Sequence, residues 1–273
     1  MAQLQLRGTV LGDVRAVLFD KDGTLSVSEP ELITLAEARV FLCLEQIPEG
    51  MKQELGPLLR RAYGLHEAAG GAGSRICPAG ITAVASRDHN LIATATALVQ
   101  VGLGWPESLS LAERVFAEAD RADARRAGAE GRHLDGGGRQ AGGTSRSTEG
   151  LRDWLEQLRS ASVACAVISN DDVAGIEHFL ASHGLDPYFA AIWSAEHRPR
   201  KPDPAAVHGL CEQLGVSAGE CALIGDANSD LQMAVAAGIP HQLALGYTAA
   251  WSTAPPLAEP HPRVQHWREL SLA

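Results

Sequence analysis

Short apolar runs that stop abruptly at acidic or polar turn residues recur along this chain of 273 residues. They occupy residues 16–19, 163–168, 190–193 and 221–224, and a weaker run occupies residues 241–245. A short apolar run bounded by turn residues is typical of a strand buried on both faces of a parallel sheet. Helical patterns separate the later runs, and alternating strands and helices predict right-handed crossovers. The sequence therefore predicts an α/β fold with a doubly wound, Rossmann-like parallel sheet.

One of the intervening helices can be delimited from its end residues. Asp203 is a candidate N-cap, Pro204 suits the first turn of a helix, and Gly215 follows the last apolar position of the pattern. Proline near the start and glycine just past the end are typical of helix boundaries. The sequence therefore predicts a helix between Asp203 and Gly215.

The stretch between the first and second apolar runs has a different character. From about residue 30 to residue 127 the apolar residues recur at helical spacing. Residues 128–143 contain seven glycines, which predicts a flexible linker. We expect an α/β core made of residues 1–27 and 149–249. We also expect an inserted all-helical domain at 28–148, with its Gly-rich return linker at about 128–148, and a tail at 250–273 packed on the core.

The charge and cysteine content argue against several classes of protein. The 23 Lys and Arg residues against 33 Asp and Glu residues give a formal net charge of −10, whereas a nucleic-acid binder needs a basic face. The five cysteines form no CxxC pair, which disfavours a disulfide scaffold or a structural zinc site. No apolar stretch resembles a signal-peptide core or a membrane span. We expect a cytoplasmic protein without nucleic-acid or membrane partners.

Acidic residues follow the first predicted strand directly. Asp20 and Asp22 point the same way along an extended chain, because side chains alternate with a period of two. Gly23 permits a sharp turn, and the Thr24 hydroxyl can tie that turn together. Two carboxylates at this spacing suit a nucleophile beside a general acid/base. A plain turn or a calcium loop uses the same residue types, but a buried strand in front of the acids disfavours the calcium loop.

Four short motifs, in this order, resemble those of the haloacid dehalogenase superfamily. They are Phe-Asp-Lys-Asp-Gly-Thr-Leu at 19–25, Ile-Ser-Asn-Asp at 168–171, Lys-Pro-Asp-Pro at 201–204 and Gly-Asp-Ala-Asn-Ser-Asp at 225–230. Each lies at the end of a predicted strand or at the start of a helix, and the resemblance covers roughly residues 1–27 and 149–249. The helical insert is placed like the cap of the phosphoglycolate-phosphatase-like branch.

The resemblance implies a phosphatase that hydrolyses a small phosphorylated metabolite, a phosphomonoester, through an aspartyl-phosphate intermediate. In that mechanism Asp20 would be the nucleophile, and Asp22 would protonate the leaving alkoxide and then deprotonate the attacking water. Ser169, with Asn170 behind it, would bind a phosphoryl oxygen. Lys201 would pair with Asp20 and with the phosphate.

The same resemblance implies Mg²⁺ as the cofactor. Asp20, the backbone carbonyl of Asp22, and Asp226 would be its ligands. Asp230 would support them as a direct or water-mediated ligand, and Thr24 would support the turn.

Two other functions stay open at this stage. A phosphomutase of the same family would return the phosphoryl group to a sugar, and a catalytically idle member would act only as a binding module. Dehalogenases of the superfamily lack an acid at the position of Asp22, which favours phosphoryl transfer here.

Two basic residues each have two possible roles. Lys21 is more polar than the apolar residue usual at its position, so it would contact the substrate or point to solvent. Arg87, in the polar cluster 86–90 that opens a helix of the insert, is a candidate to bind an anionic substrate group. The alternative is that Asp88 or Asn90 caps that helix while Arg87 is solvated.

Overall fold

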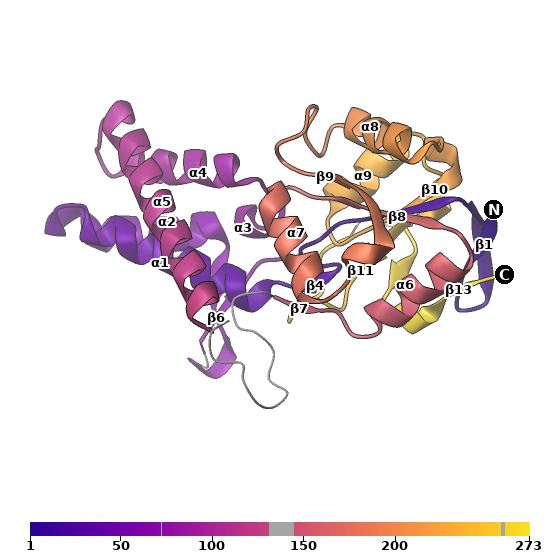
Figure 1. The fold of residues 1–273 in the computed structure, drawn as a ribbon. Coiled ribbons are helices and arrows are strands. Elements are labelled where there is room, and N and C mark those ends of the chain that lie inside the picture. Colours follow the sequence, from indigo (N-terminus) through magenta and orange to yellow (C-terminus); the bar gives the residue numbers. More distant parts are fainter. Residues whose placement is uncertain (72, 131–144, 258–259) are drawn as a thin grey trace. The chain divides into compact units, whose positions relative to one another are not determined.

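The structure, a computed structural model, describes residues 1–71, 73–130, 145–257 and 260–273 (Figure 1). The chain divides into two compact units. The first contains Met1–Ser28 and Arg146–Ala273, and the second is Glu29–Ser145. The predicted Gly-rich linker lies mostly at residues 131–144, outside the described residues.

The first unit is built on a six-stranded parallel sheet (Figure 1). Its strands are β3 (Ala16–Phe19), β8 (Ala164–Ile168), β9 (Phe189–Trp193), β10 (Cys221–Gly225), β11 (Ala244–Tyr247) and β12 (Arg263–Val264). The order across the sheet is β12-β11-β10-β3-β8-β9, and every neighbouring pair is parallel. The predicted doubly wound sheet is confirmed. After β3 the chain forms β8 and β9 on one side of β3 in the sheet, and it then returns to form β10 on the other side of β3. A crevice for a ligand is expected at such a switch point, at the carboxyl ends of the strands.

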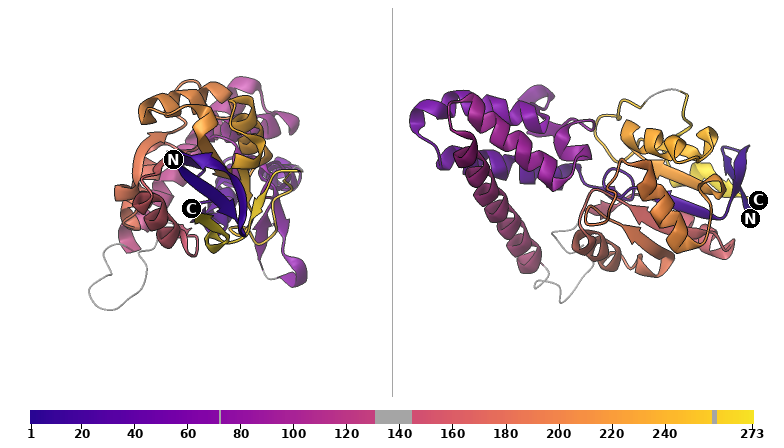
Figure 2. Two further views of the ribbon diagram at one scale, coloured as in Figure 1. Left: turned by 90° about the vertical axis from the view of Figure 1, so that its right-hand side faces the viewer. Right: turned by 90° about the horizontal axis from the view of Figure 1, so that it is seen from above.

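In the described part of the chain, four helices cover this sheet. They are α6 (Leu151–Ser160), α7 (Val173–Ser182), α8 (Pro204–Leu214) and α9 (Asn228–Ala236). Right-handed crossovers place α6 and α7 on one face and α8 and α9 on the other (Figure 2). All side chains of β3 and β10 are buried as a result, which explains their uninterrupted apolar sequences.

The helix predicted between Asp203 and Gly215 is α8. The Asp203 side chain accepts a hydrogen bond from the Ala205 N–H at 2.9 Å, and Pro204 is the first helical residue. Gly215 ends the helix with a φ of +64°, a conformation that favours glycine.

The weakest predicted strand begins later than expected. His241–Leu243 form a 3₁₀ turn closed by a hydrogen bond from the Leu243 N–H to the Pro240 carbonyl at 2.7 Å. Because the Leu243 N–H is used within that turn, it does not pair with a neighbouring strand, and β11 starts only at Ala244. Other 3₁₀ turns are Ala69–Gly71, Asp186–Tyr188, Ala218–Glu220 and Trp267–Glu269.

The two ends of the chain meet in a small antiparallel sheet that the sequence patterns did not predict. Its strands are β1 (Ala2–Leu6), β2 (Thr9–Val14) and β13 (Leu270–Leu272), in the order β13-β1-β2. Leu4 pairs with Leu272, and the two termini lie side by side (Figure 1). A further short antiparallel pair joins β4 (Ser26–Val27) to β7 (Arg146–Ser147).

The second unit is mainly helical. Its helices are α1 (Glu29–Glu45), α2 (Glu49–Tyr63), α3 (Ile81–Val84), α4 (Arg87–Gln100) and α5 (Trp105–Glu130). The expectation of helices alone is wrong for one segment, where β5 (Leu65–Glu67) and β6 (Ser74–Ile76) form an antiparallel pair. Gly64 ends α2 with a φ of +74°, which turns the chain out of the helical path. None of the described helices combines the length and the apolar character needed to cross a bilayer.

Candidate active site

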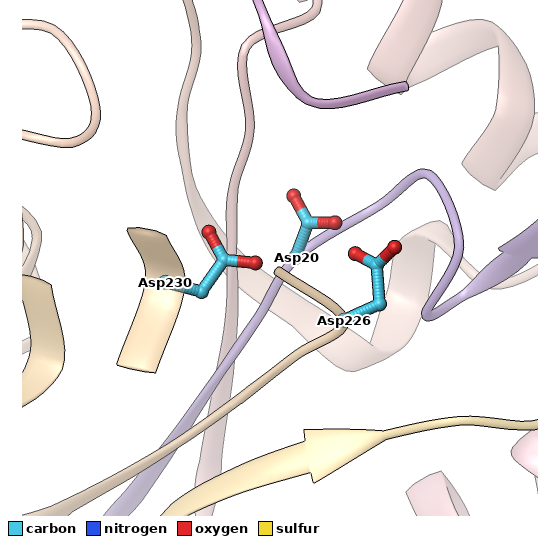
Figure 3. Close-up of side chains that lie close together, drawn as sticks. All are labelled: Asp20, Asp226 and Asp230. Atoms are coloured by element: carbon cyan, nitrogen blue, oxygen red, sulfur yellow. The ribbon is translucent and has the colours of Figure 1, made fainter. Parts of the chain in front are cut away.

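Three buried aspartates meet at the carboxyl edge of the parallel sheet (Figure 3). Asp20 follows β3, Asp226 follows β10, and Asp230 lies in the first turn of α9. One carboxylate oxygen from each lies within 4.8 Å of the others. The register of β3 and β10 brings the first two together, because the Asp20 N–H donates to the Ile224 carbonyl at 2.9 Å.

A buried lysine links two of these acids. The Nζ of Lys201 lies 2.6 Å from Asp20 Oδ1 and 2.7 Å from Asp230 Oδ1, and it also donates to the Ile168 carbonyl at 3.3 Å. Burial disfavours the charged lysine, but its two carboxylate partners outweigh that effect and raise its pKa. Lys201 is therefore a fixed positive charge at the centre of the cluster.

One cation does not balance three acids. Burial raises the pKa of Asp20 to about 6, with Lys201 opposing the rise and Asp230 adding to it. Burial also raises the pKa of Asp226 well above its ordinary value, and the neighbouring Asp20 and Asp230 increase that shift. Closely placed carboxylate oxygens are the donors that Mg²⁺ and Ca²⁺ prefer, so these residues fit a divalent cation.

Asp22 contacts a different set of residues. It lies in a turn beyond β3, where the alternation of an extended strand does not apply. Its Oδ1 accepts from Lys21 Nζ at 2.8 Å, from Ser28 Oγ at 2.5 Å and from Ser26 Oγ at 3.3 Å. Burial alone would raise the pKa of Asp22, but Lys21 and the two serines hold it below its ordinary value. Asp22 is therefore more acidic than an ordinary aspartate.

The turn that carries these acids is closed by its backbone. The N–H groups of Thr24 and Ser26 donate to the Lys21 carbonyl at 3.2 and 3.0 Å. The Thr24 hydroxyl is buried and has no hydrogen-bond partner among the described residues, so the prediction that it ties the turn is wrong. Gly23 has a φ of +79°, and a Cβ there would lie 2.3 Å from Asp226 Oδ2. Only glycine fits so close to that carboxylate.

The second motif lies at the end of the neighbouring strand. Ser169 follows β8, which pairs with β3, and its side chain is buried. Its N–H donates to the Trp193 carbonyl at 2.9 Å, and its Oγ accepts from the Asp171 N–H at 3.2 Å. Asn170 follows directly.

The structure therefore brings Asp20, Asp226, Asp230 and Lys201 into one cluster, and places Ser169 and Asn170 at the same sheet edge.

Arg87 is not a free anion-binding group. Its Nε and Nη2 both donate to Asp120 Oδ2, at 2.9 and 2.7 Å, and this ion pair joins α4 to α5. The cap of α4 is Ser86, whose Oγ accepts from the His89 N–H at 3.4 Å, rather than Asp88 or Asn90. The expectation that Asp88 or Asn90 caps the helix is therefore wrong, and Arg87 is paired with an acid that a separate helix supplies.

Sequence reasoning missed one residue of the site. The indole N–H of the buried Trp251 donates to Asp226 Oδ2 at 2.6 Å. Trp251 lies beyond β11, outside the four motifs, and its only signal in the sequence is its position after a strand that ends at this sheet edge. The hydrogen bond fixes the orientation of the Asp226 carboxylate.

Removing that hydrogen bond should weaken metal binding. Partners that orient metal ligands typically contribute about 10- to 100-fold to affinity. Trp251→Phe keeps most of the ring but lacks the N–H, so we expect Mg²⁺ affinity, measured by isothermal titration calorimetry, to fall by that factor. Trp105→Phe, at a half-exposed position of α5, is the control. Equal Mg²⁺ affinity in the parent and Trp251→Phe would show that Asp226 does not need this partner.

Comparisons with known proteins agree with this geometry. The sequence model of the haloacid dehalogenase-like hydrolases matches residues 14–238. A phosphoglycolate phosphatase from Photobacterium profundum is 30% identical over 116 residues, which are 42% of this chain and 49% of that protein. One from Thiobacillus denitrificans is 37% identical over 97 residues, which are 35% and 43% of the two chains. The chain thus matches less than half the length of these curated relatives.

Solved structures share the fold over nearly the whole chain. A predicted phosphoglycolate phosphatase from Haemophilus somnus superimposes with a TM-score of 0.60 at 19% identity, covering 93% of this chain and 95% of the other. A hydrolase of the same superfamily, subfamily IA, from Geobacter sulfurreducens gives 0.53 at 20% identity, covering 94% of each chain. The matched family region contains the aspartate cluster, Lys201 and the strands β3, β8, β9 and β10 of the parallel sheet. The chain belongs to the haloacid dehalogenase-like hydrolase family.

Proposed function

We propose that this protein is a magnesium-dependent phosphatase that hydrolyses a small phosphomonoester through an aspartyl-phosphate intermediate. The observation that supports it most is the contact between the buried Asp20 and Lys201 at 2.6 Å, inside a cluster with two further acids. A nucleophilic carboxylate, a fixed cation for the phosphoryl oxygens and a set of oxygen donors for a metal are thereby gathered at one sheet edge.

The electrostatics explain the need for a metal. Two carboxylates about 5 Å apart repel by about 3 kcal/mol at an effective dielectric of 20. Asp20, Asp226 and Asp230 carry three negative charges when ionised, and Lys201 returns only one positive charge. When bound, Mg²⁺ would neutralise this excess and polarise the phosphoryl group. Asp20, Asp226 and the backbone carbonyl of Asp22 would hold it, with Asp230 as a direct or water-mediated partner.

In the first chemical step, an oxygen of the Asp20 carboxylate attacks phosphorus. The new O–P bond forms as the ester P–O bond breaks, and Asp22, which must first take up a proton from solvent, delivers that proton to the leaving alkoxide. Lys201 keeps Asp20 oriented and stabilises negative charge on the phosphoryl oxygens, together with the Ser169 hydroxyl and Asn170. In the second step, Asp22 takes a proton from the water that hydrolyses the aspartyl-phosphate. The lowered pKa of Asp22 suits this second role.

The helical unit would act as the cap that sets substrate specificity. The names of the curated relatives make 2-phosphoglycolate the first substrate to test. The substrate class rests on these relatives and on the aspartate cluster, and the same cluster also suits a phosphomutase.

A substrate panel tests the proposal against its alternatives. The protein with Mg²⁺ is incubated with about a hundred phosphorylated metabolites, and free phosphate is measured. We expect release from 2-phosphoglycolate or another small ester. A phosphomutase would instead isomerise a sugar phosphate, visible by ³¹P NMR, and a binding module would release nothing and isomerise nothing.

A further inference from the structure

Lys21, in the turn between the two motif aspartates, neither points to solvent nor lies free to bind a substrate. Its side chain is buried, with Nζ 2.8 Å from Asp22 Oδ1 and 3.0 Å from Asp171 Oδ2. The same Nζ lies 5.8 Å from the centre of the Phe179 ring. Lys21 thus joins the turn after β3 to the turn after β8.

Asp171 is itself anchored. Its Oδ1 accepts from the Asp172 N–H at 2.9 Å, and Asp172 is the N-cap of α7, accepting from the Gly175 N–H at 2.7 Å. The position of Lys21 is therefore set by the start of a helix rather than by Asp22 alone. A continuous chain of contacts runs from that helix end through Asp171 and Lys21 to the Asp22 carboxylate.

The contacts to Asp22 are one-sided. Lys21, Ser26 and Ser28 all reach the same oxygen, Oδ1. Three donors on one oxygen fix the plane of the carboxylate and leave Oδ2 to exchange protons with a reacting group. Ser26 lies in β4 and Ser28 follows it, whereas Lys21 ties the same carboxylate through Asp171 to the start of α7.

We propose that Lys21 and Asp171 are positioning residues that hold Asp22 in the orientation required for proton transfer. The inference rests on the proposed phosphatase function, because it assigns a purpose to Asp22. Lys21 acts through Asp22, because among the described residues its Nζ pairs with the side chains of Asp22 and Asp171 and not with those of Asp20 or Asp226. The role is specific to this sequence, since an apolar residue at position 21 could not make either contact.

Leaving-group dependence separates this role from a structural one. An alkoxide needs a proton as it leaves, whereas 4-nitrophenolate is a good leaving group that departs without one. With a misplaced Asp22, the first step should therefore slow for an alkyl phosphate and stay nearly unchanged for 4-nitrophenyl phosphate. The second step needs Asp22 as a base for both substrates, so the phosphorylated enzyme should accumulate with 4-nitrophenyl phosphate, whose first step stays fast.

The experiment compares the parent enzyme with Lys21→Met and Asp171→Asn, using 2-phosphoglycolate, or the best alkyl ester of the panel, and 4-nitrophenyl phosphate. For Lys21→Met we expect kcat/KM to fall about 100-fold with the alkyl ester, the lower range of general acid–base contributions. With the aryl ester we expect kcat/KM to change less than about threefold while kcat falls, with a burst of 4-nitrophenolate. Asp171→Asn keeps Lys21 beside Asp22. We expect it to lower kcat/KM about tenfold with the alkyl ester and to leave kcat/KM nearly unchanged with the aryl ester.

Lys52→Met, which removes a lysine paired with Glu49 on α2, is the matched control and should leave both substrates unaffected. Equal losses on the two esters in both site variants would overturn the proposal, as would unchanged kinetics. If Lys21→Met does not fold, Asp171→Asn decides by the same criterion, because it retains the buried cation and its contact with Asp22. A parent enzyme that releases no phosphate from any ester refutes the proposed function itself, before any variant is compared.

Discussion

Asp20→Asn is expected to lower phosphate release by about 10⁴-fold or more, as is usual when a catalytic nucleophile is removed. An uncharged amide in place of the carboxylate does not attack phosphorus, so no aspartyl-phosphate forms. Folding should survive because Lys201 keeps its second partner, Asp230, at 2.7 Å, and because the crowded acids lose one charge. The measurements are kcat by phosphate release, acid-quench trapping of the phosphorylated enzyme, and the thermal midpoint.

The matched control for this variant is Asp13→Asn, which makes the same chemical change at an exposed position of β2. It should leave kcat unchanged. A kcat for Asp20→Asn within tenfold of the parent value would assign the nucleophile to another residue.

Metal removal should have a comparably large effect. We expect EDTA to abolish phosphate release and Mg²⁺ to restore it, whereas Ca²⁺ should support little turnover because it prefers longer bonds and more ligands. Mg²⁺ at 100 times its dissociation constant should also stabilise the folded protein by about 2.7 kcal/mol, visible as a rise in thermal midpoint. Hydrolysis that continues undiminished in EDTA would contradict the mechanism.

Asp226→Asn tests the metal site through the thermal stability of the protein. A carboxyl group whose pKa is raised in the folded state binds protons more tightly there than in the unfolded chain, so it destabilises the metal-free protein at pH values above its ordinary pKa. Its replacement by asparagine should therefore raise the thermal midpoint in EDTA at pH 7. The same variant should lose the further rise that Mg²⁺ produces in the parent.

The sequence predicted the parallel sheet and the location of the site for one physical reason. Strands covered by helices on both faces must be apolar throughout, so β3 and β10 are recognisable as uninterrupted apolar runs. Such strands end together at one edge, which makes the residue after each run a site candidate. Asp20 and Asp226 were identified in this way, and the structure places their carboxylates together.

Local patterns were less informative where the partner of a residue comes from a distant part of the chain. β1 and β13 lie at opposite ends of the sequence and pair with each other. Neither segment has an apolar pattern strong enough to predict a strand. The Thr24 hydroxyl and Arg87 were assigned roles from their neighbours in sequence. In the structure, backbone hydrogen bonds close the turn that contains Thr24. Arg87 pairs with Asp120, which lies 33 residues away in the sequence.

The sequence by itself determined the class of fold, the order of its main strands and helices, and the carboxylates at the strand ends. Periodicity and turn chemistry are properties of neighbouring residues, and they suffice for those features. Only the tertiary structure decided that Lys21 is buried between Asp22 and Asp171, and that Trp251 donates to Asp226. Both contacts depend on how separate strand ends come together at the sheet edge, because a hydrogen bond requires a distance of about 3 Å and sequence spacing alone does not set it.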